Sequence, residues 1–190
     1  MPYMTEKERE RVKEIISQAN RLLRGWGIDD EIRIEEGRRA EGLWGKEWKF
    51  PEVIFTFSGK EIGVCKAPMI KTATGSGYVY SRLWGKRAWY YWKGARWING
   101  VAIDFILAVK AFENYLYRFK SLNATYTYID GDENDELVIR IWFCRPPESI
   151  SIRIVSEQKG FLYIRDNLVR EGNVNEIVRD VVKLVSLLTL

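Results

Sequence analysis

Apolar residues recur at helical spacing near the start of the chain, and they form one stripe. The stripe comprises Val12, Ile15, Ile16, Ala19, Leu22 and Leu23. This period predicts an amphipathic helix over about residues 5–24. Thr5 and Glu8 make a capping-box pattern at its start, and Gly25 and Gly27 follow its end.

Two further segments have helical spacing. Residues from about 100 to 120 carry apolar positions on most sides of a helix, among them Phe105, Val109 and Phe112, which indicates a central, buried helix. A last helix is predicted over about 173–188. It places on one face Val174, Ile177, Val178, Val181 and Val185.

Alternating apolar and polar positions, bounded by turn residues, predict strands in the remaining segments. They are Glu31–Glu36, Glu52–Phe57, Ile62–Ala67, Thr125–Ile129, Glu136–Phe143, Ser149–Ser156 and Phe161–Arg165, with a hairpin across Ser58–Glu61. The sequence therefore predicts an α+β fold, in which a largely antiparallel β-sheet of about eight or nine strands is flanked by three helices. The 190 residues fit a single domain, 1–190.

Composition narrows the chemistry that this fold can support. The chain has no histidine, which removes serine–histidine and cysteine–histidine nucleophile pairs and histidine-ligated metal sites. Two isolated cysteines, Cys65 and Cys144, cannot build a four-cysteine zinc site, so we expect small buried hydrophobes there. We expect neither a metal nor a cofactor.

Other features concern the setting of the protein. No apolar run is long enough to cross a membrane, and the N-terminal residues are charged where a signal peptide needs an apolar stretch. These features predict a cytoplasmic protein with no membrane partner. The two glutamines among many charged residues suggest a thermophilic source.

Charge is distributed unevenly along the chain. Residues 62–103 contain no acid and carry +7, from Lys66, Lys71, Arg82, Lys86, Arg87, Lys93 and Arg96. The whole chain carries +4, so the rest carries −3, the difference between the two. Such polarisation is typical of a protein with a polyanionic partner.

Aromatic residues coincide with this basic segment. Gly85-Lys86 fits a two-residue hairpin turn with Gly at its first central position. That turn would make Arg82 face Trp89 and Tyr80 face Tyr91, on one face of a two-stranded ribbon. The predicted face comprises Tyr78, Tyr80, Arg82, Trp84, Arg87, Trp89, Tyr91 and Lys93.

Rings interleaved with cations are typical of surfaces that stack bases and neutralise phosphates. We therefore predict a non-enzymatic nucleic-acid-binding protein, for DNA or RNA, that uses this ribbon together with Lys71, Lys86 and Arg96. The segment Lys71–Gly77 can add backbone amides for a phosphate.

The same residues permit two other interpretations. Tyr, Trp and Arg are enriched at protein interfaces, so the face can instead form a homodimer or bind another protein. Cross-strand aromatic pairs can also be internal packing. The absence of acids over residues 62–103 favours nucleic acid, because neither a protein interface nor a core has a reason to exclude carboxylates.

The segment from Asp130 to Glu136 is rich in acids but predicts a solvated turn. Asp135 stands where a calcium loop requires Gly, and no Glu falls at its last position. The segment lies between two strand patterns, which favours a hairpin turn.

The order helix, strand, hairpin, helix, strand over residues 5–129 resembles the restriction-endonuclease-like nuclease superfamily. The resemblance implies a metal-dependent nuclease, or an inactive relative, with Glu52 opening the hairpin and Lys66 closing it. The acid two residues before the lysine is missing, since the triplet is Val64-Cys65-Lys66, and the nearest carboxylate is Glu61. A divalent metal is implied only under this alternative.

Overall fold

The computed structural model describes most of the chain. The described residues are 6–36, 40–41, 47–48, 53–66, 69–74, 77–82, 88–91, 96–99, 103–119, 122–130, 136–143, 149–156 and 158–188. For the described residues within 36–48, 64–99 and 122–137, the structure describes only the backbone.

Three helices lie close to the positions that the sequence predicts. Helix α1 spans Glu6–Gly25, α2 spans Ile103–Leu116 and α3 spans Val174–Leu188. The predicted stripe on α1 is buried, with Val12, Ile15 and Leu23 almost inaccessible to solvent. Thr5, the predicted cap, lies outside the described residues.

Helix α1 ends in a Schellman motif. Gly27 has φ 83°, its amide bonds to Arg24 O, and the amide of Ile28 bonds to Leu23 O over 3.0 Å. Ile28 is buried, as is Leu23. The turn that the two glycines predict therefore returns the chain into the core.

One sheet has seven antiparallel strands in the order β1-β4-β5-β6-β7-β8-β9. They are β1 (Ile32–Glu36), β4 (Val53–Phe57), β5 (Lys60–Lys66), β6 (Met69–Thr74), β7 (Gly77–Arg82), β8 (Ala88–Tyr91) and β9 (Arg96–Asn99). Ser58 and Gly59, both at positive φ, join β4 to β5 in a two-residue turn.

The second sheet has five antiparallel strands in the order β10-β11-β12-β13-β14. They are β10 (Leu122–Asp130), β11 (Glu136–Phe143), β12 (Ser149–Ile154), β13 (Gly160–Ile164) and β14 (Asn167–Gly172). A two-stranded ribbon pairs β2 (Ala40–Glu41) with β3 (Glu47–Trp48).

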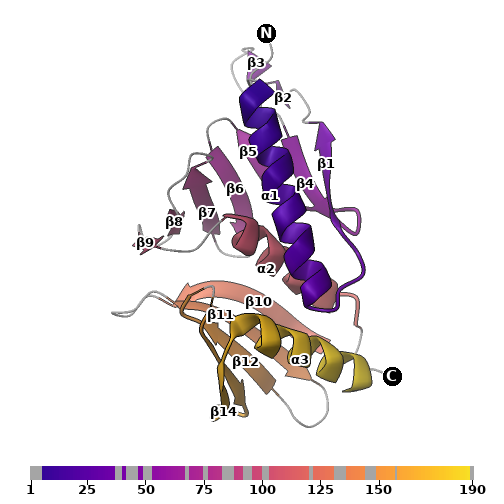
Figure 1. The fold of residues 1–190 in the computed structure, drawn as a ribbon, viewed down its shortest axis with the longest axis vertical. Helices are drawn as coiled ribbons and strands as arrows, with labels where there is room; N and C mark the ends of the chain where they lie inside the picture. Colours follow the sequence, from indigo (N-terminus) through magenta and orange to yellow (C-terminus); the bar gives the residue numbers. More distant parts are fainter. Residues whose placement is uncertain are drawn as a thin grey trace.

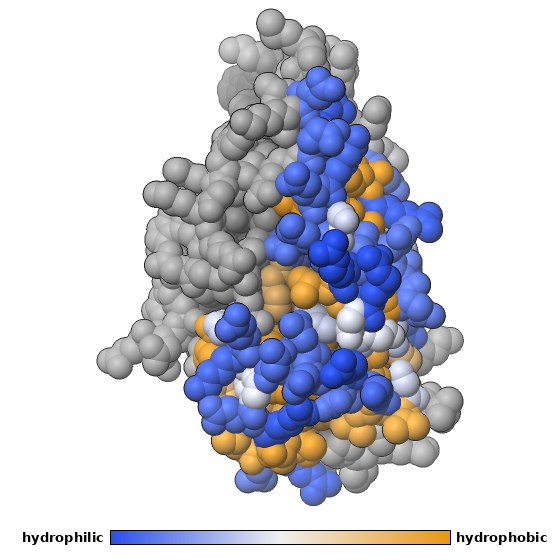
Figure 2. Space-filling model, viewed as in Figure 1, coloured by the Kyte–Doolittle hydropathy of each residue, from blue (hydrophilic) through white to orange (hydrophobic). Residues whose placement is uncertain are grey.

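The helices cover one side of each sheet. Helices α1 and α2 lie against the seven-stranded sheet and α3 lies against the five-stranded sheet (Figure 1). Buried residues of all three helices and of both large sheets form one hydrophobic cluster, which includes Phe55, Phe112, Ile152 and Val178. The outward faces of α1 and α3 are mostly hydrophilic (Figure 2).

The predicted α+β class, its three helices and its antiparallel pairing are confirmed. The predicted single sheet is wrong, because the strands divide between two large sheets and a ribbon. Strands β2, β3, β6, β9 and β14 were not predicted. Among the described residues, no helix has the length and apolar character needed to cross a membrane.

Candidate nucleic-acid interface

The basic segment of the sequence maps onto one continuous part of the seven-stranded sheet. Residues 62–99 supply most of β5 and all of β6, β7, β8 and β9, which are neighbours in the sheet order. A segment that is acid-free in sequence is therefore also a single region in space.

The pairing of β7 with β8 differs by one residue from the predicted ribbon. The register pairs Val79 with Tyr91, Tyr80 with Tyr90, and Ser81 with Trp89. An odd number of residues then lies between partners, which a two-residue turn at Gly85-Lys86 cannot produce. The predicted partners Tyr80–Tyr91 and Arg82–Trp89 are therefore wrong. Residues 83–87 themselves lie outside the described residues.

A shift of one residue moves every side chain of β8 to the other side of the sheet. Trp89 and Tyr91 now share a side with Ser81 and Val79, whereas Tyr90 shares a side with Tyr80. The row of Tyr91 continues through Val79, Thr72 and Gly63 to the buried Phe55. Trp89 and Tyr91 thus belong to the side that faces α1 and α2.

The opposite side gathers residues of the predicted nucleic-acid site and three that the prediction did not include. One row crosses four strands through Lys71, Tyr80, Tyr90 and Trp97, each the register partner of the next. We call the sheet interface the basic and aromatic residues on this side of β5–β9: Lys66, Lys71, Tyr78, Tyr80, Arg82, Tyr90 and Trp97. Tyr90 was missed because its side depends on the register, and Trp97 was missed because β9 was not predicted.

The charge changes along this side of the sheet. At its β1–β4–β5 end lie the exposed side chains of Glu35 and Glu61, with the exposed Arg33 beside them. The buried Thr56 lies on the same side. Toward β6 and β7 the charged residues are Lys66, Lys71 and Arg82. On this side the described acids therefore lie toward the β1 edge, together with Arg33, and the cations lie on β5, β6 and β7 in the middle of the sheet.

The other predicted site residues fall in three places. Trp84, Lys86, Arg87 and Lys93 lie outside the described residues. Arg96 pairs with Tyr91 and so lies on the helix-facing side of β9. Lys71–Thr74 belong to β6 and pair with β7, so the prediction of a phosphate-binding loop at these residues is wrong; residues 75–76 lie outside the described residues.

The geometry gives no support to the nuclease alternative. Glu61 and Lys66 lie near opposite ends of β5, about 16 Å apart at the rise of a strand. In a metal-dependent site of this kind the carboxylates bind one ion and the lysine lies close beside it. Glu52 lies outside the described residues. Among the residues that are described, no group of three or more acids and cysteines could hold a metal ion.

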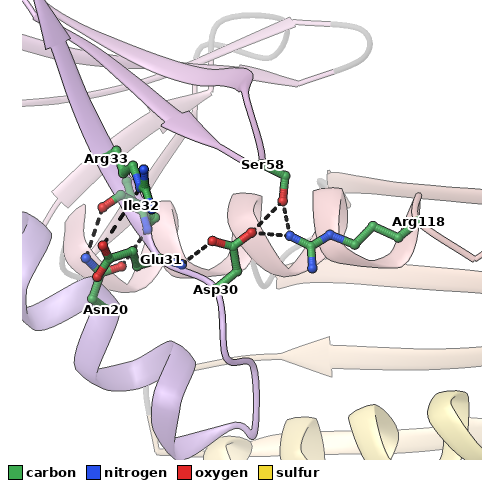
Figure 3. A network of polar contacts seen from close by, with 7 residues as sticks. All are labelled: Asn20, Asp30, Glu31, Ile32, Arg33, Ser58 and Arg118. Atoms are coloured by element: carbon green, nitrogen blue, oxygen red, sulfur yellow. Dashed lines mark hydrogen bonds and ion pairs between the residues drawn. The ribbon is translucent and has the colours of Figure 1, made fainter.

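A polar cluster lies where the β4–β5 turn meets α1 and α2 (Figure 3). Asp30 accepts hydrogen bonds from the Glu31 amide and the Ser58 hydroxyl, each over 2.8 Å. The Arg118 guanidinium, beyond the end of α2, bonds to both Asp30 and Ser58. Partial burial disfavours the Asp30 carboxylate, but these hydrogen bonds and the Arg118 charge outweigh burial and lower its pKa below 3.8.

The same cluster fixes the edge of the seven-stranded sheet. Asn20 on α1 donates through Nδ2 to Ile32 O and accepts from the Ile32 amide, over 3.0 and 2.7 Å. The side chain of a buried helix residue thus completes both hydrogen bonds of one residue on the edge strand β1. This cluster positions α1, β1 and the β4–β5 hairpin relative to one another. Strand β5 of that hairpin is the first strand of the sheet interface.

Comparison of the chain with protein-family models, with curated proteins and with solved structures finds no match.

Proposed function

We propose that the protein binds nucleic acid, DNA or RNA, through the sheet interface, without catalysing a reaction on it. The observation that carries the proposal is the coincidence of an acid-free, +7 segment with adjacent strands of one sheet. Protein interfaces and cores do not require such a segregation of charge, whereas a polyanion does.

Two kinds of contact support this proposal. Lys66, Lys71 and Arg82 can neutralise phosphates, and the row of Tyr80, Tyr90 and Trp97 can stack on bases. Neighbouring strands lie about 4.8 Å apart, and this row has one aromatic residue on each of three adjacent strands, β7, β8 and β9. Each stacked base contributes about 1–3 kcal/mol with little dependence on sequence. Lys86, Arg87 and Lys93, from the same segment, supply further positive charge.

The test is a titration of single-stranded and duplex DNA and RNA oligonucleotides at increasing salt, with magnesium or manganese present. Release of counterions from three phosphates predicts a slope of log affinity against log salt of about −2 on a single strand, and a steeper slope if more cations take part. Undetectable binding at low salt would refute the proposal.

The same titration separates binding from cleavage. We expect every oligonucleotide to remain intact after long incubation with either metal. Cleavage that disappears in both Glu52→Ala and Lys66→Ala would establish the nuclease alternative instead.

A further inference from the structure

The five-stranded sheet has a second face with rings and cations. Helix α3 covers one side of this sheet, where Ile150, Ile152 and Leu162 are buried and Arg170 forms ion pairs with Asp180 and Glu176 of α3. We call the opposite side of β11–β14 the outer face. By register it carries Val138, Arg140, Trp142, Ser149, Ser151, Arg153, Phe161, Tyr163, Leu168 and Glu171.

The rings of this face are accessible. Trp142 is 40% exposed, and Phe161 and Tyr163 are half-buried. Ser149, the register partner of Trp142, is buried. Ser151, which lies between Arg140 and Tyr163, is half-buried. On β12, between Trp142 of β11 and Tyr163 of β13, this face thus carries the small residues Ser149 and Ser151.

Cations lie over two of these rings. The Arg153 guanidinium carbon is 5.8 Å from the centroid of Tyr163, and Lys159 Nζ is 5.4 Å from the centroid of Phe161. A cation at this distance is attracted to the face of the ring.

The charge of this region favours an anionic partner. Three cations, Arg140, Arg153 and Lys159, lie on this face or over its rings, against one acid on the face, Glu171. Glu171 pairs with Lys159 over 3.0 Å, but both side chains are more than half exposed. An exposed pair of this kind is worth little, so a phosphate can replace the carboxylate.

We propose that the outer face is a second binding site, for single-stranded nucleic acid, in which Trp142, Phe161 and Tyr163 stack on bases. A duplex would not bind in this way, because its bases are stacked on each other and cannot stack on protein rings. The site uses another sheet and other residues than the sheet interface. It therefore stands or fails independently of it.

The experiment is photo-crosslinking of the full-length protein to a uridine oligonucleotide of about 16 nucleotides carrying 4-thiouridine, with the crosslinked peptides identified by mass spectrometry. We expect crosslinks within β11–β13 in addition to β6–β9. Crosslinks confined to β6–β9 would overturn this inference and leave the proposed function intact. Crosslinks confined to β11–β13 would support this inference and refute the proposed binding at the sheet interface.

Affinity measurements on variants complete the test. Trp142→Leu, Phe161→Leu and Tyr163→Leu keep an apolar side chain and remove the ring, and each should weaken oligonucleotide binding about tenfold or more. Leu187→Ser, at an exposed residue of α3 on the other side of the sheet, should leave binding unchanged. Equal affinities for all four variants and the wild type would overturn the inference.

A second copy of the chain is the competing occupant of this face, since Leu168 and Val169 are more than half exposed beside it. Figure 2 shows hydrophobic residues gathered at the lower end of the molecule, where Figure 1 places β14. Sedimentation should show a monomer at high concentration. A dimer that Leu168→Asp dissociates would assign the face to self-association and overturn the proposal.

Discussion

Nε1 of Trp26 donates a hydrogen bond of 2.8 Å to Oδ1 of Asn175, a residue 149 positions further along the chain. Trp26 follows the end of α1, and Asn175 lies in the first turn of α3. The indole is 1% exposed and makes edge contacts with Phe105 and Phe112 of α2. One side chain thus joins all three helices.

Asn175→Ala should destabilise the fold by about 1–3 kcal/mol, because it leaves the buried indole N–H without its acceptor. Urea unfolding measures the loss. In the Trp26→Phe background, where the donor is absent, Asn175→Ala should cost clearly less. Equal losses in both backgrounds would show that the hydrogen bond does not contribute.

The paired glycines of β13 and β14 differ in the space around them. A Cβ on Gly160 would lie 2.9 Å from Val174 Cγ2 and 3.2 Å from the Arg153 carbonyl oxygen, whereas a Cβ on Gly172 would meet nothing closer than 4.0 Å. Gly160→Ala should therefore cost about 1–3 kcal/mol through overpacking against α3. Its register partner provides the control, since Gly172→Ala should leave the unfolding midpoint nearly unchanged.

A buried ion pair lies within α2. Lys110 Nζ is 2.9 Å from Glu113 Oε2, the two residues are 7% and 3% exposed, and Tyr117 donates to Glu113 Oε1. Lys110→Ala should cost about 3–5 kcal/mol, because a buried carboxylate loses its counter-charge. Replacement of both partners, Lys110→Met with Glu113→Leu, should cost less than Lys110→Ala alone. A larger loss in the double variant would contradict this account.

The Asp30 cluster predicts a pH dependence of stability. The folded protein holds the pKa of Asp30 below 3.8, so its ionised form stabilises the fold above that pH, and the contribution is lost as pH falls through the lower, folded pKa. Asp30→Asn should flatten the acid limb of a stability profile and leave its alkaline limb unchanged. Arg118→Gln removes one cause of the lowered pKa of Asp30, so the loss of stability should begin at a higher pH. An acid limb unaffected by Asp30→Asn would contradict the assignment.

Local sequence patterns predicted most helices and strands, but they did not predict the long-range contacts between them. The stripe on α1, its terminal glycines and the β4–β5 hairpin are local signals, and each is found close to its predicted position. The contacts Trp26–Asn175 and Arg118–Asp30 join residues far apart in sequence and carry no local signature. The division of the strands into two sheets is a long-range property of the same kind.

The candidate site shows how a small local error spreads. Strands β5, β7 and β8 of the basic segment were predicted, but the register of β7 with β8 rested on an assumed turn at Gly85-Lys86. Because side chains of a strand alternate, a shift of one residue exchanged Tyr91 for Tyr90 on the outward side. The charge pattern was independent of the register, so the prediction of a basic region of the sheet did not depend on the turn.

Tyr90 and Tyr91 therefore provide the most direct test of the sheet interface. They are adjacent and identical in type, but the register places them on opposite sides of β8. Tyr90→Ala should weaken oligonucleotide binding at low salt about tenfold or more while thermal stability changes little. Tyr91→Ala should lower stability and, in the protein that remains folded, leave affinity unchanged. Loss of affinity on Tyr91→Ala with none on Tyr90→Ala would contradict the account.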